Sequence, residues 1–237
     1  MKITSSWASV RWLFAFHWGI AASFSFKEKD KELLKYYETQ VEKNHIDIRF
    51  HTEVKSLDDV ETDEYVIAAG SMGPNRLHLP GSERFLTAQE YISNGCKDGE
   101  NVVIIGGGLT GCEMAYEIAK SGRKPVIVEV KDDILIAPGS CMANTSFLRD
   151  AFEYYNVPIY TSARTVSADE NSLTILDETG KEVRLPADVI VQSIGFKRGL
   201  PFDVPENADH VHVIGDSAKI SNLLNAVHSA YNLAMQI

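Results

Sequence analysis

The sequence contains few cysteines, and they lie far apart. Cys96, Cys112 and Cys141 form no C-x-x-C pair and no zinc or iron–sulfur spacing. These three residues therefore do not make a cysteine-bound metal centre. Separated thiols are typical of a reducing compartment, so we predict a cytoplasmic protein in which Cys112 is a small buried residue of a helix.

Basic residues are also scarce. The chain has 23 lysines and arginines against 33 acidic residues, its formal net charge is −10, and its cations do not cluster. This composition argues against a nucleic-acid partner and against an anionic membrane surface.

Long apolar runs are missing as well. The aromatic-rich N-terminal segment, residues 1–26, contains an apolar run over residues 12–20 that His17 interrupts. The run is too short to cross a membrane, so we predict no membrane partner. Basic residues before it and alanines after it also fit a poor signal peptide. That interpretation is the weaker one, because the rest of the chain is typical of a cytosolic protein.

A strand, a glycine turn, a helix and a second strand follow one another within residues 101–130. The apolar run Val102–Ile105 predicts a buried strand, and apolar periodicity predicts a helix over residues 109–121. The second strand, residues 126–128, ends at Glu129. A unit of about thirty residues with these parts in this order is the dinucleotide-binding fingerprint.

The turn of this unit has the spacing G-x-G-x-x-G. Gly106 lets the chain leave the strand sharply, Gly108 leaves its backbone open to a pyrophosphate, and Gly111 lets the helix pack closely on the sheet. The helix N-terminus adds free N–H groups and a positive dipole end. The candidate pyrophosphate contacts are Gly106, Gly107, Gly108, Leu109, Thr110 and Gly111.

Glu129 indicates which dinucleotide binds. Its carboxylate can accept hydrogen bonds from two ribose hydroxyls, whereas a 2′-phosphate would meet a negative charge there. Asp132 and Asp133 follow closely, and Lys131 is the only nearby cation in the sequence. We therefore predict NAD(H) rather than NADP. The alternative, a glycine turn that only packs a helix, is weakened by the strand, helix and acid around it.

The rest of the chain predicts further helices and strands. A capping box at Thr87 and Glu90 predicts a short helix, and residues 178–180 are typical of a hairpin turn. Other helices are expected over residues 30–43, 143–155 and 221–236, strands over residues 46–50, 64–70, 157–160, 172–176, 182–185, 188–195 and 210–216, and a loop over residues 132–142. The apolar faces expected to be buried are Leu33, Leu34, Tyr37 and Val41 in the first helix, Phe147, Leu148, Ala151 and Phe152 in the second, and Leu223, Val227, Ala230 and Ala234 in the last.

Four signals stand in a characteristic order. They are EYVIAAG at residues 64–70, GGGLTGCE at residues 106–113, DVIVQSIG at residues 188–195 and HVHVIGD at residues 210–216, with a terminal helix after them. This order resembles the two-dinucleotide-binding flavoproteins. It is most similar to the C-terminal half of the NADH:flavin oxidoreductases related to 2,4-dienoyl-CoA reductase, 2-enoate reductase and trimethylamine dehydrogenase.

The resemblance implies an α/β fold with two Rossmann-like three-layer domains. An NAD domain, residues 83–200, would be inserted into an incomplete FAD domain made of residues 1–82 and 201–237. It implies NAD contacts at Gly106, Gly108, Gly111 and Glu129, and further cofactor contacts, mostly to FAD, at Ala69, Gly70, Gly195, Gly215 and Asp216. The last helix would direct its N-terminus towards the flavin pyrimidine.

Two acidic residues could have either a cofactor-binding role or a purely structural role. Glu113 matches an acid that the family places near the nicotinamide, but a solvated helix residue explains it equally well. Asp216 matches the acid that accepts a hydrogen bond from a ribityl hydroxyl, and its alternative is an acid favoured by a helix start.

The chain also departs from the family. Residues 1–26 contain one glycine, Gly19, so they cannot form the glycine fingerprint with which the FAD domain begins. The barrel that carries FMN, the iron–sulfur cysteines and the disulfide-reductase cysteine pair are missing too. We predict either an NADH-oxidising flavin module or a non-catalytic NAD-binding remnant. The chain would be a fragment, a truncated product, or a subunit that needs a partner chain or an oligomer through its N-terminal region.

Overall fold

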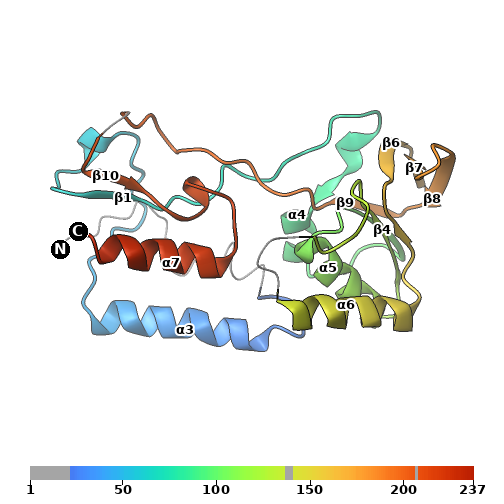
Figure 1. Ribbon diagram of the computed structural model, residues 1–237, viewed down its shortest axis with the longest axis horizontal. Helices are drawn as coiled ribbons and strands as arrows, with labels where there is room; N and C mark the ends of the chain where they lie inside the picture. Colours follow the sequence, from blue (N-terminus) through green and yellow to red (C-terminus); the bar gives the residue numbers. More distant parts are fainter. Residues whose placement is uncertain (1–21, 137–140, 206–207) are drawn as a thin grey trace. The chain divides into compact units, whose positions relative to one another are not determined.

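The computed structural model describes residues 22–136, 141–205 and 208–237 (Figure 1). The predicted apolar run over residues 12–20 and the signal-peptide alternative lie outside the described residues, and the predicted loop over residues 132–142 is described only in part. In the described residues, no helix has the length and apolar character needed to cross a membrane.

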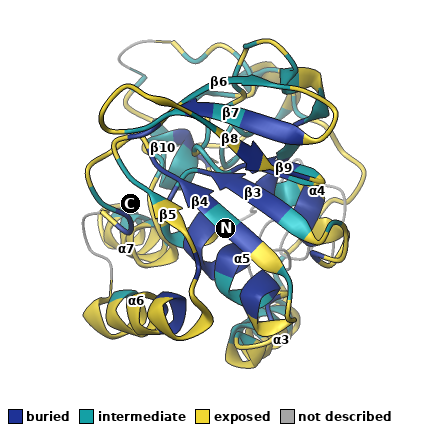
Figure 2. Cartoon of the chain, turned by 90° about the vertical axis from the view of Figure 1, so that its right-hand side faces the viewer, coloured by how far each residue is buried: buried dark blue, intermediate teal, exposed yellow. Residues whose placement is uncertain are grey.

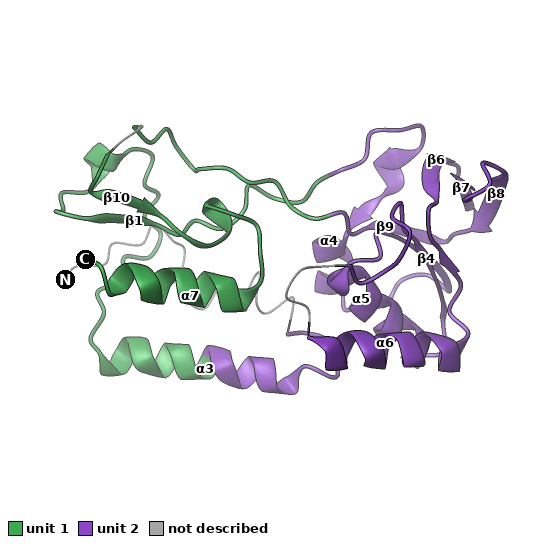
Figure 3. Ribbon diagram, in the orientation of Figure 1, with its two compact units in different colours: residues 1–15, 35–75, 195–237 green, residues 16–34, 76–194 purple. Residues whose placement is uncertain are grey.

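The described chain divides into two compact units (Figure 3). The larger unit holds Arg76–Ile194 and the segment that ends at Leu34, and the smaller unit holds Lys35–Asn75 and Gly195–Ile237. The domain boundaries expected from the sequence, after residues 82 and 200, stay predictions.

A parallel sheet of five strands, in the order β2-β9-β3-β4-β5, forms the centre of the larger unit. The strands are β2 (Leu86–Thr87), β3 (Asn101–Ile105), β4 (Lys124–Val128), β5 (Ile159–Tyr160) and β9 (Val189–Gln192). Ile105 is in register with Val128 on one side and with Gln192 on the other. The carboxyl ends of the three central strands therefore meet at one edge of the sheet, which is where open α/β sheets bind ligands.

Strand β3 is buried over most of its length (Figure 2), and its successive residues face opposite sides of the sheet. Val102 and Ile104 are fully buried against the helices, and Val103 and Ile105 face a second sheet. The helices are α4 (Ala88–Ser93), α5 (Leu109–Lys120) and α6 (Met142–Tyr155). The second sheet is antiparallel, β6-β7-β8, with strands β6 (Arg164–Ala168), β7 (Ser172–Leu176) and β8 (Glu182–Pro186). The larger unit thus has the three layers expected of the NAD domain.

Short-range signals in this unit are confirmed. Thr87 caps α4, since its hydroxyl accepts from the Glu90 N–H group while the Glu90 carboxylate accepts from the Thr87 N–H group. The hairpin of β7 and β8 is also observed. Strand β6 was not predicted, and Phe147 is 50% exposed although burial was expected.

The smaller unit contains a parallel pair, β1 (Tyr65–Ile67) and β10 (Val211–Val213), and helix α7 (Leu223–Ala234). Helix α3 (Glu28–Lys43) runs from the larger unit into this one. The expected inner face of α3 is only half-buried: Leu33, Leu34, Tyr37 and Val41. The buried face predicted for α7 is wrong, because all four of its residues are exposed: Leu223, Val227, Ala230 and Ala234. A sheet of two strands offers too little area to cover a helix face.

The strand predicted over residues 46–50 is wrong. These residues have no regular structure, and Phe50 is 45% exposed. The alternation of Ile46, Ile48 and Phe50 fits a strand, but no described strand pairs with them. A strand without a ladder partner leaves its backbone groups to water and is not stable.

Candidate functional site

The fingerprint turn, residues 106–111, leaves β3 and enters α5. Gly106 has a φ of +110°, and a Cβ there would lie 2.3 Å from the Ser193 carbonyl oxygen. A Cβ on Gly111 would lie 2.1 Å from the Gly106 carbonyl oxygen. The fold therefore requires glycine at both positions, one for the sharp turn and one for the close approach of α5.

Gly108 differs from its two neighbours in the motif. It is the N-cap of α5 with an extended backbone, φ −70° and ψ 178°, that any residue adopts. A Cβ added to it would meet no atom within 4 Å. The fold does not need this glycine, but it leaves open space beside the first N–H groups of a 12-residue helix. The turn fits a pyrophosphate group, which such N–H groups and the helix dipole bind.

Glu129 lies beside this turn, at the end of β4. The residue is 8% exposed, and its carboxylate accepts two backbone hydrogen bonds, from the Gly107 N–H group at 2.6 Å and from the Lys131 N–H group at 2.9 Å. Each bond goes to a different carboxylate oxygen, so each oxygen keeps a lone pair for a ribose hydroxyl. The sequence predicted only that Glu129 accepts hydrogen bonds from a ribose. The structure adds that its hydrogen bond with Gly107 stabilises the turn.

Glu113, on α5, is buried rather than solvated. It is 5% exposed, and its carboxylate forms an ion pair with Lys27, whose Nζ lies 2.7 Å from Oε1. The rings of Phe24 and Phe26 lie within 6.0 Å of the same ammonium. Burial raises the pKa of Glu113, and the charge and hydrogen bond of Lys27 oppose this rise. The interpretation of Glu113 as a solvated residue is wrong, and its position near a nicotinamide stays a prediction.

Lys27→Met is expected to lower the free energy of unfolding by about 3 kcal/mol at neutral and higher pH, because it leaves a buried carboxylate without a cation. Without that cation the pKa of Glu113 rises further. A carboxyl group whose pKa is raised in the folded state is protonated as the pH falls through that pKa, and the folded protein then no longer contains a buried unpaired charge. The stability lost through Lys27→Met is therefore smaller in acid.

Urea unfolding at about pH 8 and about pH 5 measures this difference. Lys29→Met is the matched control, since Lys29 pairs with Glu32 at the surface, where the two side chains are 87% and 70% exposed. We expect the control to change stability by less than about 0.5 kcal/mol. A Lys27→Met loss that is equal at both pH values would contradict the assignment.

The candidate FAD residues gather at the carboxyl ends of β1 and β10. Gly70 and Gly215 both have positive φ, +77° and +61°. The hydroxyl of Ser217, a buried residue, donates to the Gly70 carbonyl oxygen at 3.0 Å and ties the two strand ends together. A Cβ on Gly70 would meet no atom within 4 Å. The sequence did not reveal Ser217, because nothing in its neighbourhood distinguishes it from other serines.

Two further candidates, Ala69 and Asp216, follow β1 and β10, whereas Gly195 follows β9 and begins a segment of the smaller unit. Asp216 accepts a hydrogen bond from the Ser221 N–H group at 3.0 Å, and Ala69 is half-buried. Gly195 has a φ of +83°, and its carbonyl oxygen accepts from the Asn75 N–H group at 2.9 Å. The FAD contacts of these residues stay predictions, and the one G-x-G-x-x-G of the sequence lies in the other unit.

A family model described as pyridine nucleotide-disulphide oxidoreductase matches residues 56–202, which is more than half of the chain. Cinnamate reductase of Clostridium sporogenes is 30% identical over 217 residues, which cover 90% of this chain and 32% of that protein. NADH oxidase of Thermoanaerobacter brockii is 26% identical over 230 residues, which cover 92% of this chain and 35% of that protein. The chain therefore spans about a third of the length of these relatives.

Solved structures show the same fold. A 2-naphthoyl-CoA reductase in complex with 2-naphthoyl-CoA has a TM-score of 0.79 and 22% identity, and the match covers 100% of this chain and 36% of that one. Thioredoxin reductase of T. acidophilum has a TM-score of 0.70 and 16% identity, and the match covers 99% of this chain and 88% of that one. The expected α/β fold with Rossmann-like parts is confirmed, as is the resemblance to the reductases. The chain belongs to the pyridine nucleotide-disulphide oxidoreductase family, a family of FAD- and NAD(P)H-dependent oxidoreductases.

Proposed function

We propose that this chain is a module that takes a hydride from NADH to FAD and passes the electrons to a centre outside these 237 residues. The observation that carries the proposal is the open cradle at Gly108, which the fold does not require and a pyrophosphate does. When bound, NADH supplies the hydride and FAD accepts it, a transfer that depends on close stacking of the two cofactors.

The residues of the chain supply binding and orientation. The fingerprint turn and the N-terminus of α5 hold the NADH pyrophosphate, and Glu129 accepts from the adenosine ribose. At the other cofactor, Gly70 and Gly215 leave their strand ends free of side chains, and Asp216 accepts from a ribityl hydroxyl. Because Glu129 repels a 2′-phosphate, the module prefers NADH to NADPH.

The relatives suggest where the electrons go. Cinnamate reductase is named for an α,β-unsaturated acid, and 2-naphthoyl-CoA reductase for an aromatic thioester. We propose that the acceptor is of this class, an unsaturated acid or its thioester, reduced at a site that this chain does not contain. Separated reduced thiols and the use of NADH both suit action in the cytoplasm.

The second candidate function is a non-catalytic NAD-binding remnant. The small two-stranded sheet and the exposed face of α7 favour this candidate, because both indicate that the described residues of the FAD part pack against few others. In this case the larger unit folds and binds NADH, but flavin does not bind.

Flavin content and NADH binding of the purified chain separate these two candidates. We expect a yellow protein that binds NADH and loses part of its flavin on dialysis, because the single glycine fingerprint leaves the FAD pyrophosphate without a cradle. A colourless protein that still binds NADH would support the remnant. A protein that binds neither cofactor would contradict both.

A further inference from the structure

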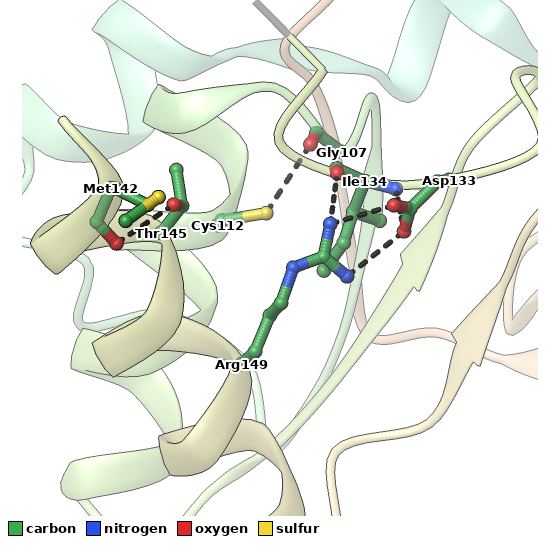
Figure 4. A network of polar contacts seen from close by, with 7 residues as sticks. All are labelled: Gly107, Cys112, Asp133, Ile134, Met142, Thr145 and Arg149. Carbon is green, nitrogen blue, oxygen red and sulfur yellow. Dashed lines mark hydrogen bonds and ion pairs between the residues drawn. The ribbon is translucent and has the colours of Figure 1, made fainter. Parts of the chain in front are cut away.

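An arginine lies close to the proposed adenosine site and is held by an acid. Arg149, on α6, forms a two-pronged ion pair with Asp133, with Nη1–Oδ1 at 2.9 Å and Nη2–Oδ2 at 2.7 Å. Its Nη2 also donates to the Ile134 carbonyl oxygen at 2.8 Å. Figure 4 shows the guanidinium pointing from α6 to the loop that carries these groups.

This loop is tied to the fingerprint turn. The Leu135 N–H group donates to the Gly107 carbonyl oxygen at 2.7 Å, and a Cβ on Gly107 would lie 2.6 Å from the Ile134 side chain. The N–H group of the same Gly107 donates to Glu129. The guanidinium of Arg149 is therefore connected, through Ile134, Leu135 and Gly107, to the carboxylate that we assign to the ribose.

The Arg149–Asp133 ion pair determines whether the positive charge of Arg149 is available to a ligand. Hydrogen bonds from Arg149 hold the pKa of the Asp133 carboxyl below its usual range, so Asp133 is ionised and neutralises the guanidinium at physiological pH. Both donor prongs of Arg149 are occupied. The side chains are 43% and 48% exposed and border an open cavity of about 500 Å³, so the guanidinium has room to move if its partner is removed.

We propose that Asp133 enforces the preference for NADH by sequestering Arg149, the guanidinium that would otherwise bind a 2′-phosphate. This inference rests on the proposed NADH-binding function. It assigns Asp133 a part in selecting the cofactor that is separate from the repulsion by Glu129: Glu129 repels the phosphate, and Asp133 withholds the group that would attract it. A guanidinium released from Asp133 presents the forked donors that phosphates prefer.

The test compares NADH and NADPH binding by fluorescence titration of the full chain. In Asp133→Asn, the amide oxygen still accepts from the Ile134 N–H group, which the aspartate does at 2.8 Å, but the charge that holds Arg149 is gone. We expect the preference for NADH over NADPH to fall about five- to tenfold, mostly through tighter NADPH binding. In the double variant Asp133→Asn/Arg149→Gln, NADPH binding should return to the wild-type level, because the released guanidinium is absent.

Asp132→Asn is the matched control. Asp132 is the neighbouring acid in the same loop, is exposed, and takes part in no ion pair of the described residues. This variant removes the same charge without releasing Arg149, so the cofactor preference should change less than about twofold. Arg149→Gln alone offers a second test, since it removes the guanidinium and should not improve NADPH binding.

Several results would overturn the inference. They are an unchanged preference in Asp133→Asn, an equal gain in Asp132→Asn, a gain that persists in the double variant, or tighter NADPH binding by Arg149→Gln. In each case NADH binding by the wild-type chain would leave the proposed function standing. A wild-type chain that binds neither nucleotide would remove the proposed function, and this inference with it.

Discussion

Gly108→Val is expected to weaken NADH binding strongly while the larger unit stays folded. No atom lies within 4 Å of a Cβ at this position, so the fold tolerates the side chain. The side chain fills the space through which the pyrophosphate reaches the N–H groups at the start of α5. Losing two charge-assisted hydrogen bonds weakens binding by about 3 kcal/mol, or roughly 100-fold.

Gly111→Val is the matched control in the same motif. Its Cβ would lie 2.1 Å from the Gly106 carbonyl oxygen, so α5 must move away from the turn. We expect a loss of folding stability of about 3 kcal/mol or more, against about 1 kcal/mol or less for Gly108→Val. NADH titration and urea unfolding of both variants measure these effects. If Gly108→Val binds NADH normally, the turn is only a packing feature.

Glu129→Ala is expected to damage both the binding of NADH and the stability of the larger unit. The substitution leaves the N–H group of Gly107, which is buried, and that of Lys131, an exposed residue, without their acceptor, and the buried group alone costs about 2–3 kcal/mol of folding stability. It also removes the acceptor for the ribose hydroxyls and the charge that repels a 2′-phosphate. NADH binding should weaken at least tenfold, and the preference over NADPH should narrow.

Glu129→Gln separates these two roles. The amide keeps the shape of the side chain and one acceptor oxygen, but its NH₂ group faces one of the two backbone donors. We expect a smaller loss of stability, about 1–2 kcal/mol, together with a narrower preference for NADH, since the repelling charge is absent. Urea unfolding and parallel titrations with NADH and NADPH measure both. A preference that is unchanged in Glu129→Gln would contradict the assignment of Glu129.

Features that depend on neighbouring residues could be predicted from the sequence. The fingerprint unit was predicted because glycine spacing, apolar runs and the final acid all lie within about thirty residues. The capping box at Thr87 and Glu90 was predicted for the same reason, since both partners lie in one helical turn. For these elements the physical cause is itself local.

Features that depend on distant residues could not be predicted. Lys27 pairs with Glu113 across 86 positions, and Ser217 meets Gly70 across 147 positions. No local pattern indicates which of the lysines near the start of α3 reaches the fingerprint helix. The wrong strand over residues 46–50 has the same origin: its alternation is local, but a strand also needs a partner, and partners come from the tertiary fold.

Flavin reduction by NADH is the direct test of the proposed hydride transfer. The full chain is loaded with excess FAD, mixed with NADH in the absence of oxygen, and followed through the flavin absorption band. We expect NADH to bleach the band, NADPH to do so less effectively, and Gly108→Val with bound FAD to respond much more weakly to NADH than the wild-type chain. A chain that holds both FAD and NADH while the flavin stays oxidised would contradict the proposed hydride transfer.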